Sequence, residues 1–287
     1  ATNIDNLSMW VLNVLVLYPF TYSSPTSMDE LLHALAEHGA SARVFSGGTD
    51  LFVAIRSGLT RPEVVIDLKH VPELGKLSFD DNTGLSIGAC VTVNQLVAAH
   101  VVQQRYGILA TAGHELATFQ LRNRATVVGN IVTASPCGDM SSPLLCLGAR
   151  VELLSSRAKR EMPLVEFITG VKTTQIADDE IVSRIVVPTD HIDAVGGYKK
   201  LKRIKGHDLG VVSVAMTKRN GTRRFAISSA APTPVLLPDF SSGASLGDIQ
   251  AKAQEMISPI DDVRCTKEYR AFMVDVFIRR LIEETAA

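Results

Sequence analysis

The chain has 287 residues, of which 46% are hydrophobic and 21% are charged, and its formal net charge is −1. These values describe an ordinary globular protein that is long enough for two or three domains. A net charge near zero gives no reason to expect a nucleic acid or an anionic membrane as a partner.

The first predicted elements are an apolar segment and an amphipathic helix. Residues 7–17 are apolar, but no lysine or arginine precedes them and they are too few to span a bilayer. We therefore expect a leader and a buried strand in a soluble protein, without a signal peptide or a membrane span. Ser27 and Glu30 fit a capping box, and the apolar spacing that follows predicts a helix over residues 28–36, which Gly39 ends.

A compact β-turn-α-β unit is predicted next. Residues 43–46 and 63–68 have the composition of strands, and residues 51–56 predict a short helix between them. The sequence Gly47-Gly48-Thr49-Asp50 predicts the turn. The same patterns predict a strand over residues 85–89 and two helices over residues 93–100 and 106–119.

Residues 124–139 have the composition of a loop, because glycine, proline and small polar residues interrupt the apolar pattern. A helix is predicted to begin at residues 143–147. Two strands are predicted over residues 150–154 and 181–187, and Pro188 ends the second.

The pattern changes after Pro188. Antiparallel strands are predicted over residues 198–202, 211–217 and 224–229. Two helices are predicted over residues 246–256 and 268–284. Asn220-Gly221 is a strong turn signal between the last two strands. We place a domain boundary near residue 189 and divide the chain into segments 1–69, 70–188 and 189–287.

The four cysteines are too widely spaced for a metal site made by this chain alone. Cys90, Cys137, Cys146 and Cys265 form no CxxC pair. This spacing argues against a zinc ribbon, a self-contained iron–sulfur cluster and a thioredoxin-like site. We interpret them as structural thiols of a cytoplasmic protein.

The first segment that suggests chemistry is Ser46-Gly47-Gly48-Thr49-Asp50-Leu51, between a predicted strand and a short helix. Two glycines allow the backbone to approach a ligand closely, and successive N–H groups form a nest for an anion. Together with the Thr49 hydroxyl, these features suit a pyrophosphate. A plain tight turn is the alternative, and the segment is neither a GxGxxG fingerprint nor a Walker loop.

The second segment combines Thr126-Val127-Val128-Gly129-Asn130 with Ser135-Pro136-Cys137-Gly138-Asp139. Thr126 and Asn130 offer hydrogen bonds with little bulk, and Asp139 is an acceptor for a ribityl or ribose hydroxyl. The alternatives are a helix N-cap for Asp139 and a satisfied turn asparagine for Asn130.

These segments, taken in order, resemble the FAD-binding medium subunit of molybdenum hydroxylases of the xanthine dehydrogenase and carbon monoxide dehydrogenase type. The resemblance also includes Ile66-Asp67-Leu68, residues 85–89, Asp179-Glu180-Ile181 and residues 230–234, and it runs from about residue 18 to the C-terminus. It implies an α+β fold: an FAD-binding PCMH-type unit of two α+β subdomains, then a C-terminal antiparallel sheet with helices, like that of the carbon monoxide dehydrogenase flavoprotein.

The resemblance also implies which residues bind FAD. The first segment is expected to wrap the pyrophosphate, through Val44, Phe45, Ser46, Gly47, Gly48, Thr49, Asp50 and Leu51. The second is expected to hold the cofactor with Thr126, Val127, Val128, Gly129 and Asn130, and Asp139 is expected on its polar chain. Leu116, Val182 and Lys199 match positions near the flavin ring.

One position departs from the family pattern. The family usually has two glycines before the asparagine of the second segment, and here the first of them is Val128. A β-branched residue tolerates a positive φ poorly, so either φ is negative here or the loop has shifted.

The resemblance implies a division of labour among subunits. A large molybdopterin subunit would oxidise the organic substrate, and a small subunit with two 2Fe–2S clusters would pass electrons to FAD in this chain. An external acceptor such as NAD would then receive them. The alternatives are a self-sufficient flavoenzyme of the same FAD-binding superfamily and a scaffold subunit that has lost its flavin.

Overall fold

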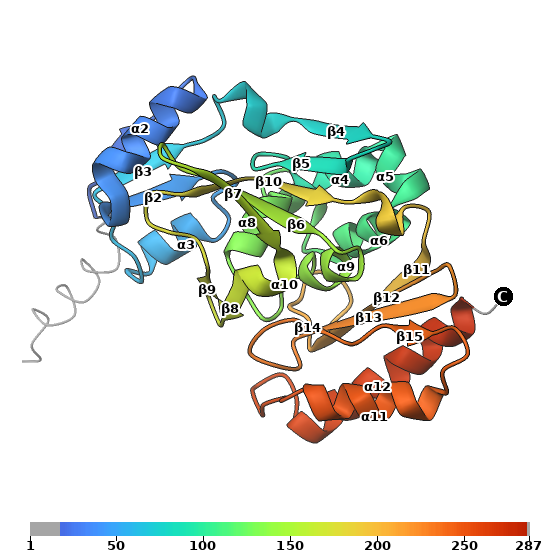
Figure 1. Cartoon of the computed structure of the whole chain (residues 1–287). Coiled ribbons are helices and arrows are strands. Elements are labelled where there is room, and N and C mark those ends of the chain that lie inside the picture. The colour runs from blue at the N-terminus through green and yellow to red at the C-terminus, as the bar shows by residue number, and fades with distance from the viewer. Residues whose placement is uncertain (1–17, 286–287) are drawn as a thin grey trace, which may run out of the picture.

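The computed structural model describes residues 18–285. The apolar segment at residues 7–17, for which a buried strand was predicted, lies outside the described residues. Three sheets account for most of the strands, and a two-stranded ribbon pairs β8 (Ile168–Gly170) with β9 (Thr173–Thr174). Figure 1 shows the sheets following one another along the chain.

The first sheet is parallel, in the order β1-β3-β2, and consists of β1 (Thr21–Ser23), β2 (Ala42–Phe45) and β3 (Val64–Asp67). Parallel neighbours require crossover connections, which here contain α2 (Met28–His38) and α3 (Leu51–Arg56). Val64 and Ile66 share a core with α2, whereas Val65 packs with Ile55 of α3. The two helices therefore cover opposite faces, and the predicted β-turn-α-β unit is confirmed.

The second sheet is antiparallel, in the order β4-β5-β10-β6-β7. Its strands are β4 (Leu77–Asp80), β5 (Gly84–Gly88), β6 (Arg150–Leu154), β7 (Lys159–Pro163) and β10 (Ile181–Val187). The strand predicted over residues 181–187 is confirmed and lies at the centre. Its Ile185 is fully buried, as expected of a central position.

Short helices separate the strands of this second sheet. They are α4 (Val93–Ala98), α5 (His100–Arg105), α6 (Gly107–Glu115), α7 (Phe119–Arg122), α8 (Val127–Val132), α9 (Ser141–Cys146) and α10 (Leu164–Phe167). Three 3₁₀ helices lie elsewhere, at Gly39–Ser41, Pro72–Gly75 and Thr189–His191.

Two predictions for this region were wrong. The helix predicted over residues 106–119 ends at Glu115, because Ala117 has a φ of 46°, which no helix accommodates. The segment 124–139 was predicted as a loop but contains α8, whose first turn is capped by the Thr126 hydroxyl. Its small residues suggested a loop, whereas burial of Val127, Val128 and Ile131 favours a helix.

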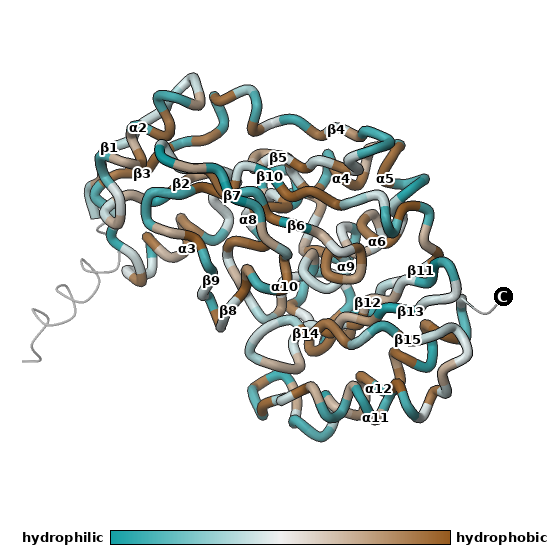
Figure 2. The backbone as a smooth tube through the Cα atoms, in the orientation of Figure 1, coloured by the Kyte–Doolittle hydropathy of each residue, from teal (hydrophilic) through white to brown (hydrophobic). Residues whose placement is uncertain are grey.

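The third sheet is antiparallel and is covered by the C-terminal helices. It contains β11 (Val195–Leu201), β12 (Val212–Arg219), β13 (Thr222–Ser228), β14 (Val235–Leu236) and β15 (Phe240–Ser241). Asn220 and Gly221 have φ values of 48° and 76°, so the predicted turn joins β12 to β13. Hydrophobic and hydrophilic residues alternate along α11 (Leu246–Met256) and α12 (Lys267–Glu284), as Figure 2 shows.

Two main hydrophobic cores hold these layers together. One core contains residues of the first and second sheets together with Tyr198, Ala215 and Ala226 of the third sheet. The other core joins the third sheet to α11 and α12. The core that contains Tyr198 includes residues from all three proposed segments, so it crosses the boundaries near residues 69 and 189. The three-segment division therefore stays a prediction. Within residues 18–285, no helix is long and apolar enough to cross a membrane.

The central position of β10 generates a stability prediction. Ile185→Ala removes a fully buried side chain from the core and is expected to lower the free energy of unfolding by about 2–5 kcal/mol. Ile260→Ala makes the same change at a side chain that is 62% exposed, so it is expected to cost under about 1 kcal/mol. Urea denaturation of the two variants measures the difference, and equal losses would contradict the assignment of β10 to the core.

Candidate functional site

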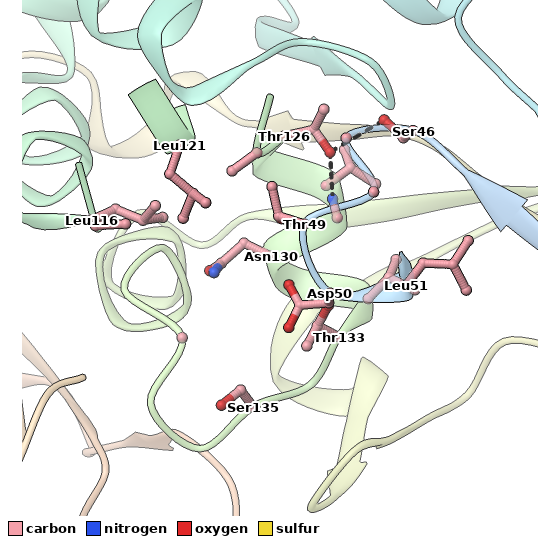
Figure 3. Close-up of a pocket in the computed structure, with 18 of the residues that line it drawn as sticks. Ser46, Thr49, Asp50, Leu51, Leu116, Leu121, Thr126, Asn130, Thr133 and Ser135 are labelled. Atoms are coloured by element: carbon pink, nitrogen blue, oxygen red, sulfur yellow. Dashed lines mark hydrogen bonds between the residues drawn. The ribbon is translucent and has the colours of Figure 1, made fainter. Parts of the chain in front are cut away.

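A cavity of about 350 Å³ is lined by the turn after β2, by α8, by β10 and by the connection between β11 and β12. That volume lies within the range of small-molecule sites. Figure 3 shows lining side chains from residues 46–51, 116, 121 and 126–135 of the cavity. Its walls come from segments far apart in sequence, namely parts of 44–51, 121–139 and 176–182, together with residues 68, 89, 116–117 and 207–209. The cavity is therefore a product of the tertiary fold.

Backbone N–H groups line one wall of the cavity, in the turn after β2. Gly48 has a φ of 77°, a conformation that favours glycine. Within the described residues, the five N–H groups from Gly47 to Leu51 make no hydrogen bond to another protein group. Such a run of free donors is suited to an anion.

This turn is pressed against the segment that precedes α8. A Cβ atom at Gly47 would lie 2.2 Å from the carbonyl oxygen of Arg124, so only glycine allows this contact. A Cβ atom at Gly48 would instead meet the rings of Phe45 and Phe52 at 2.5 and 2.8 Å. Glycine at 47 and 48 is thus required by packing against the protein's own atoms, and at 48 also by the positive φ.

The Thr126 hydroxyl joins the two candidate segments. Its Oγ1 accepts a hydrogen bond from the Gly129 N–H at 3.0 Å and lies 3.3 Å from Ser46 Oγ (Figure 3). Ser46 Oγ also donates to the Ala89 carbonyl oxygen at 3.0 Å. One side chain therefore caps α8 and fixes the end of β2.

Val128 does not strain the backbone, because it lies in the first turn of α8 and has no positive φ. Its side chain is almost fully buried and lines the cavity. The first of the two explanations offered for this departure, a negative φ, is the one the structure shows.

Asn130 and Asp139 contribute polar groups to the lining of the cavity. Asn130 Oδ1 accepts from the Met140 N–H at 3.2 Å, which leaves its amide NH₂ group free of protein acceptors within the described residues. Asp139 is not a helix N-cap: α9 begins at Ser141, and the Asp139 carboxylate instead accepts from Tyr198 Oη at 2.8 Å and Lys200 Nζ at 2.9 Å.

Burial sets the protonation behaviour of this group. It raises the pKa of the Asp139 carboxyl above its ordinary value, and the Lys200 ammonium and the Tyr198 hydroxyl oppose part of that rise. Burial and the neighbouring Asp139 raise the pKa of Tyr198 well above its usual value, so this residue remains a phenol donor. The three side chains form a buried polar network at the edge of the cavity.

Lys199 does not reach the cavity. Its ammonium pairs with Glu284 of α12 at 2.6 Å, on the opposite face of β11 from Tyr198 and Lys200. Lys200 Nζ also donates to the Glu115 carbonyl oxygen at 3.1 Å. Because side chains alternate along a strand, Tyr198 and Lys200 share a face, but this alternation does not tell which face of the strand meets Asp139.

Apolar side chains cover the rest of the cavity wall. Leu116 and Val182 were expected there, and both are buried. Phe45 and Val127 were also expected at the site, but they pack into neighbouring cores and do not line the cavity. The structure brings together the other predicted site residues: Val44, Ser46, Gly47, Gly48, Thr49, Asp50, Leu51, Leu116, Thr126, Val128, Gly129, Asn130, Asp139 and Val182.

Sequence reasoning missed several lining residues. Leu121 and Ile176 complete the apolar wall, and His207, Asp208 and Leu209 enter from the connection between β11 and β12. No local pattern marks these positions. Residues 207–209 reach the cavity only because the third sheet packs against the rest of the described chain. Asp208 accepts hydrogen bonds from the Arg203 guanidinium, which lowers the pKa of its carboxyl.

The polar groups around the cavity do not form a metal centre. Among residues 18–285, no group of three or more histidine, cysteine, aspartate or glutamate side chains is placed to hold a metal ion. All four cysteines are free thiols.

Comparisons with known proteins agree with one another over most of the chain. Residues 18–190 match the family described as "FAD binding domain in molybdopterin dehydrogenase". The carbon monoxide dehydrogenase medium chain of Hydrogenophaga pseudoflava is 28% identical over 276 residues, covering 92% of this chain and 96% of that protein. The nicotine 6-hydroxylase medium subunit of Paenarthrobacter nicotinovorans is 29% identical, covering 93% and 97%.

A solved structure supports the same relationship. Carbon monoxide dehydrogenase from Hydrogenophaga pseudoflava, in a form that lacks the Mo-pyranopterin moiety of its molybdenum cofactor, contains a chain that superposes with a TM-score of 0.86 and 27% identity. The match covers 94% of this chain and 98% of the other. The predicted α+β fold, with its C-terminal antiparallel sheet and helices, is confirmed. The chain belongs to the family of FAD-binding medium subunits of molybdenum hydroxylases.

Proposed function

We propose that this chain binds FAD in the cavity and passes electrons from the iron–sulfur clusters of a partner subunit to an external acceptor such as NAD. The observation that carries the proposal is the pairing of two segments. A turn with five free N–H groups lies against the capped start of α8, and both line one cavity. Bound FAD would supply a redox centre that exchanges electrons singly or in pairs.

The residues present fit such a ligand. The N–H groups from Gly47 to Leu51 are suited to a pyrophosphate, and the Thr49 hydroxyl lies beside them. The Asp139 carboxylate offers an acceptor for a sugar or ribityl hydroxyl, held in place by Tyr198 and Lys200. The apolar wall excludes water from a planar ring system.

The partners are inferred from the relatives. Because these are named as a medium chain and a medium subunit, the molybdopterin and the two 2Fe–2S clusters would belong to a large and a small subunit. The similar relatives are named for carbon monoxide and for nicotine, at 28% and 29% identity. We infer from this spread that the substrate is determined in another subunit.

Two other functions remain as alternatives. A self-sufficient flavoenzyme would need acid–base side chains in contact with a substrate, and Asp139 and Lys200 are instead engaged with each other. A flavin-free scaffold was suggested by Val128 alone, and this residue does not strain the backbone, although its side chain lines the cavity.

The first prediction concerns the cofactor. The purified complex is expected to contain stoichiometric FAD that acid precipitation releases into the supernatant, because the chain offers no dedicated attachment motif. Absorbance of the supernatant measures it. Yellow flavin retained in the pellet would contradict non-covalent binding, and a colourless complex would favour the scaffold function.

The second prediction tests the junction between the two segments. Thr126→Val keeps the shape of the side chain but leaves the Gly129 N–H without its acceptor and separates Ser46 from α8. The dissociation constant of FAD is expected to rise about tenfold, as for a lost buried hydrogen bond. Titration of the apoprotein with FAD, followed by flavin fluorescence, measures this change.

Thr92→Val is the matched control, since Thr92 caps α4 in the same way and its side chain bonds only to Gln95. Both variants are expected to lose about 0.5–2 kcal/mol of stability from the missing cap. Only the variant at residue 126 is expected to weaken FAD binding. Equal weakening in both would show that the effect is one of stability.

The third prediction separates the half-reactions. The isolated, FAD-loaded subunit is expected to show no reduction by any organic substrate of the complex, whereas the chemically reduced subunit is expected to pass electrons to the acceptor. Anaerobic stopped-flow mixing with each reactant measures both steps. Bleaching of the flavin by substrate without a partner subunit would favour the self-sufficient flavoenzyme.

A further inference from the structure

Two cavity walls are connected by a residue that lies outside both of them. Arg264 lies in the irregular segment between α11 and α12, and its Nη1 atom donates to Cys137 Sγ at 2.9 Å and to the Gly210 carbonyl oxygen at 3.1 Å. Cys137 lines the cavity, and Gly210 directly follows the lining residues 207–209. The two acceptors belong to segments 73 positions apart in the chain (210 − 137).

Asp262 fixes the direction of the Arg264 guanidinium. Its carboxylate accepts from Arg264 Nε at 3.0 Å, from Nη2 at 2.6 Å and from the Arg264 backbone N–H at 2.8 Å. Arg270, which is buried in α12, pairs with the same carboxylate at 3.1 Å. The Arg264 side chain is only 17% exposed, so its donors are aimed before any ligand arrives.

Residues 202–210, here called the 202–210 segment, have few other attachments to the cavity wall. At its start, Lys202 pairs with Glu115 at 2.7 Å, and Arg203 and Asp208 pair within the segment itself. Residues 203–207 are exposed. At its end, the bond from Arg264 to Gly210 links it to the wall that carries Cys137 and Asp139.

We infer that Arg264 is a positioning residue for the FAD site, which holds the end of the 202–210 segment against the wall formed by residues 137–139. This inference rests on the proposed binding of FAD in the cavity. It extends the site to the C-terminal helices, beyond residues 18–190 that match the family. Arginine is required because one planar guanidinium donates to three partners at once.

The test compares Arg264→Met with Arg224→Met. Arg224 is 16% exposed, pairs with Asp239 at 2.9 Å and donates to the Cys146 carbonyl oxygen at 3.2 Å, but none of these three residues lines the cavity. Each variant loses one ion pair, to Asp262 or to Asp239, and one hydrogen bond to a distant segment, to Cys137 or to the Cys146 carbonyl oxygen. They are therefore matched in their expected loss of thermal stability.

Two readouts are taken on the full chain. The FAD dissociation constant is expected to rise about tenfold or more in Arg264→Met and to stay within about twofold of wild type in Arg224→Met. Trypsin cleavage after the exposed Lys205, measured without FAD by mass spectrometry, is expected to accelerate only in the variant at residue 264. Arg264→Lys, which keeps the charge but not the planar fork, is expected to fall between wild type and Arg264→Met.

Each outcome decides the inference. Unchanged FAD affinity in Arg264→Met, unchanged cleavage in that variant, or equal changes in Arg224→Met would each overturn it. If Arg264→Met does not fold, Arg264→Lys supplies the same two readouts. A wild-type chain that binds no FAD would count against the proposed function, whereas the cleavage rates, which need no flavin, would still decide the role of Arg264.

Discussion

The arrangement of the cavity walls depends on the contacts that the Thr126 hydroxyl makes with Gly129 and Ser46. This hydroxyl caps α8 through the Gly129 N–H and lies beside Ser46 at the end of β2. Next to it, Gly47 approaches the Arg124 carbonyl so closely that no side chain fits. Together these contacts fix the turn after β2 against the start of α8. That turn, whose N–H groups have no acceptor among the described residues, consequently lines the cavity.

The second and third sheets supply further residues at and beside the cavity. β10 lies at the centre of the second sheet and contributes Val182 to the apolar wall. From the third sheet, Tyr198 and Lys200 of β11 reach across to Asp139 and keep its carboxylate in a buried polar network. A buried carboxylate without such partners would be costly, so the network and the docking of the third sheet depend on each other.

This arrangement suits a subunit that holds a cofactor and leaves substrate chemistry to others. The polar groups at the cavity are donors and acceptors for binding, and two of the carboxylates that line it are paired, Asp139 with Lys200 and Asp208 with Arg203. The match to carbon monoxide dehydrogenase and nicotine 6-hydroxylase medium subunits at similar identity agrees with a part that is common to enzymes of different substrates.

By itself, the sequence determined most local elements and the two candidate binding segments, because capping residues, turn glycines and strand periods act over a few neighbouring positions. The strand at 181–187 and the turn at Asn220-Gly221 follow from such patterns. Only the tertiary structure decided that α8 forms in a loop-like segment, that Lys200 and not Lys199 faces Asp139, and that residues 207–209 reach the cavity. Burial and contacts between distant segments determine these features, and neither is encoded in the spacing of adjacent residues.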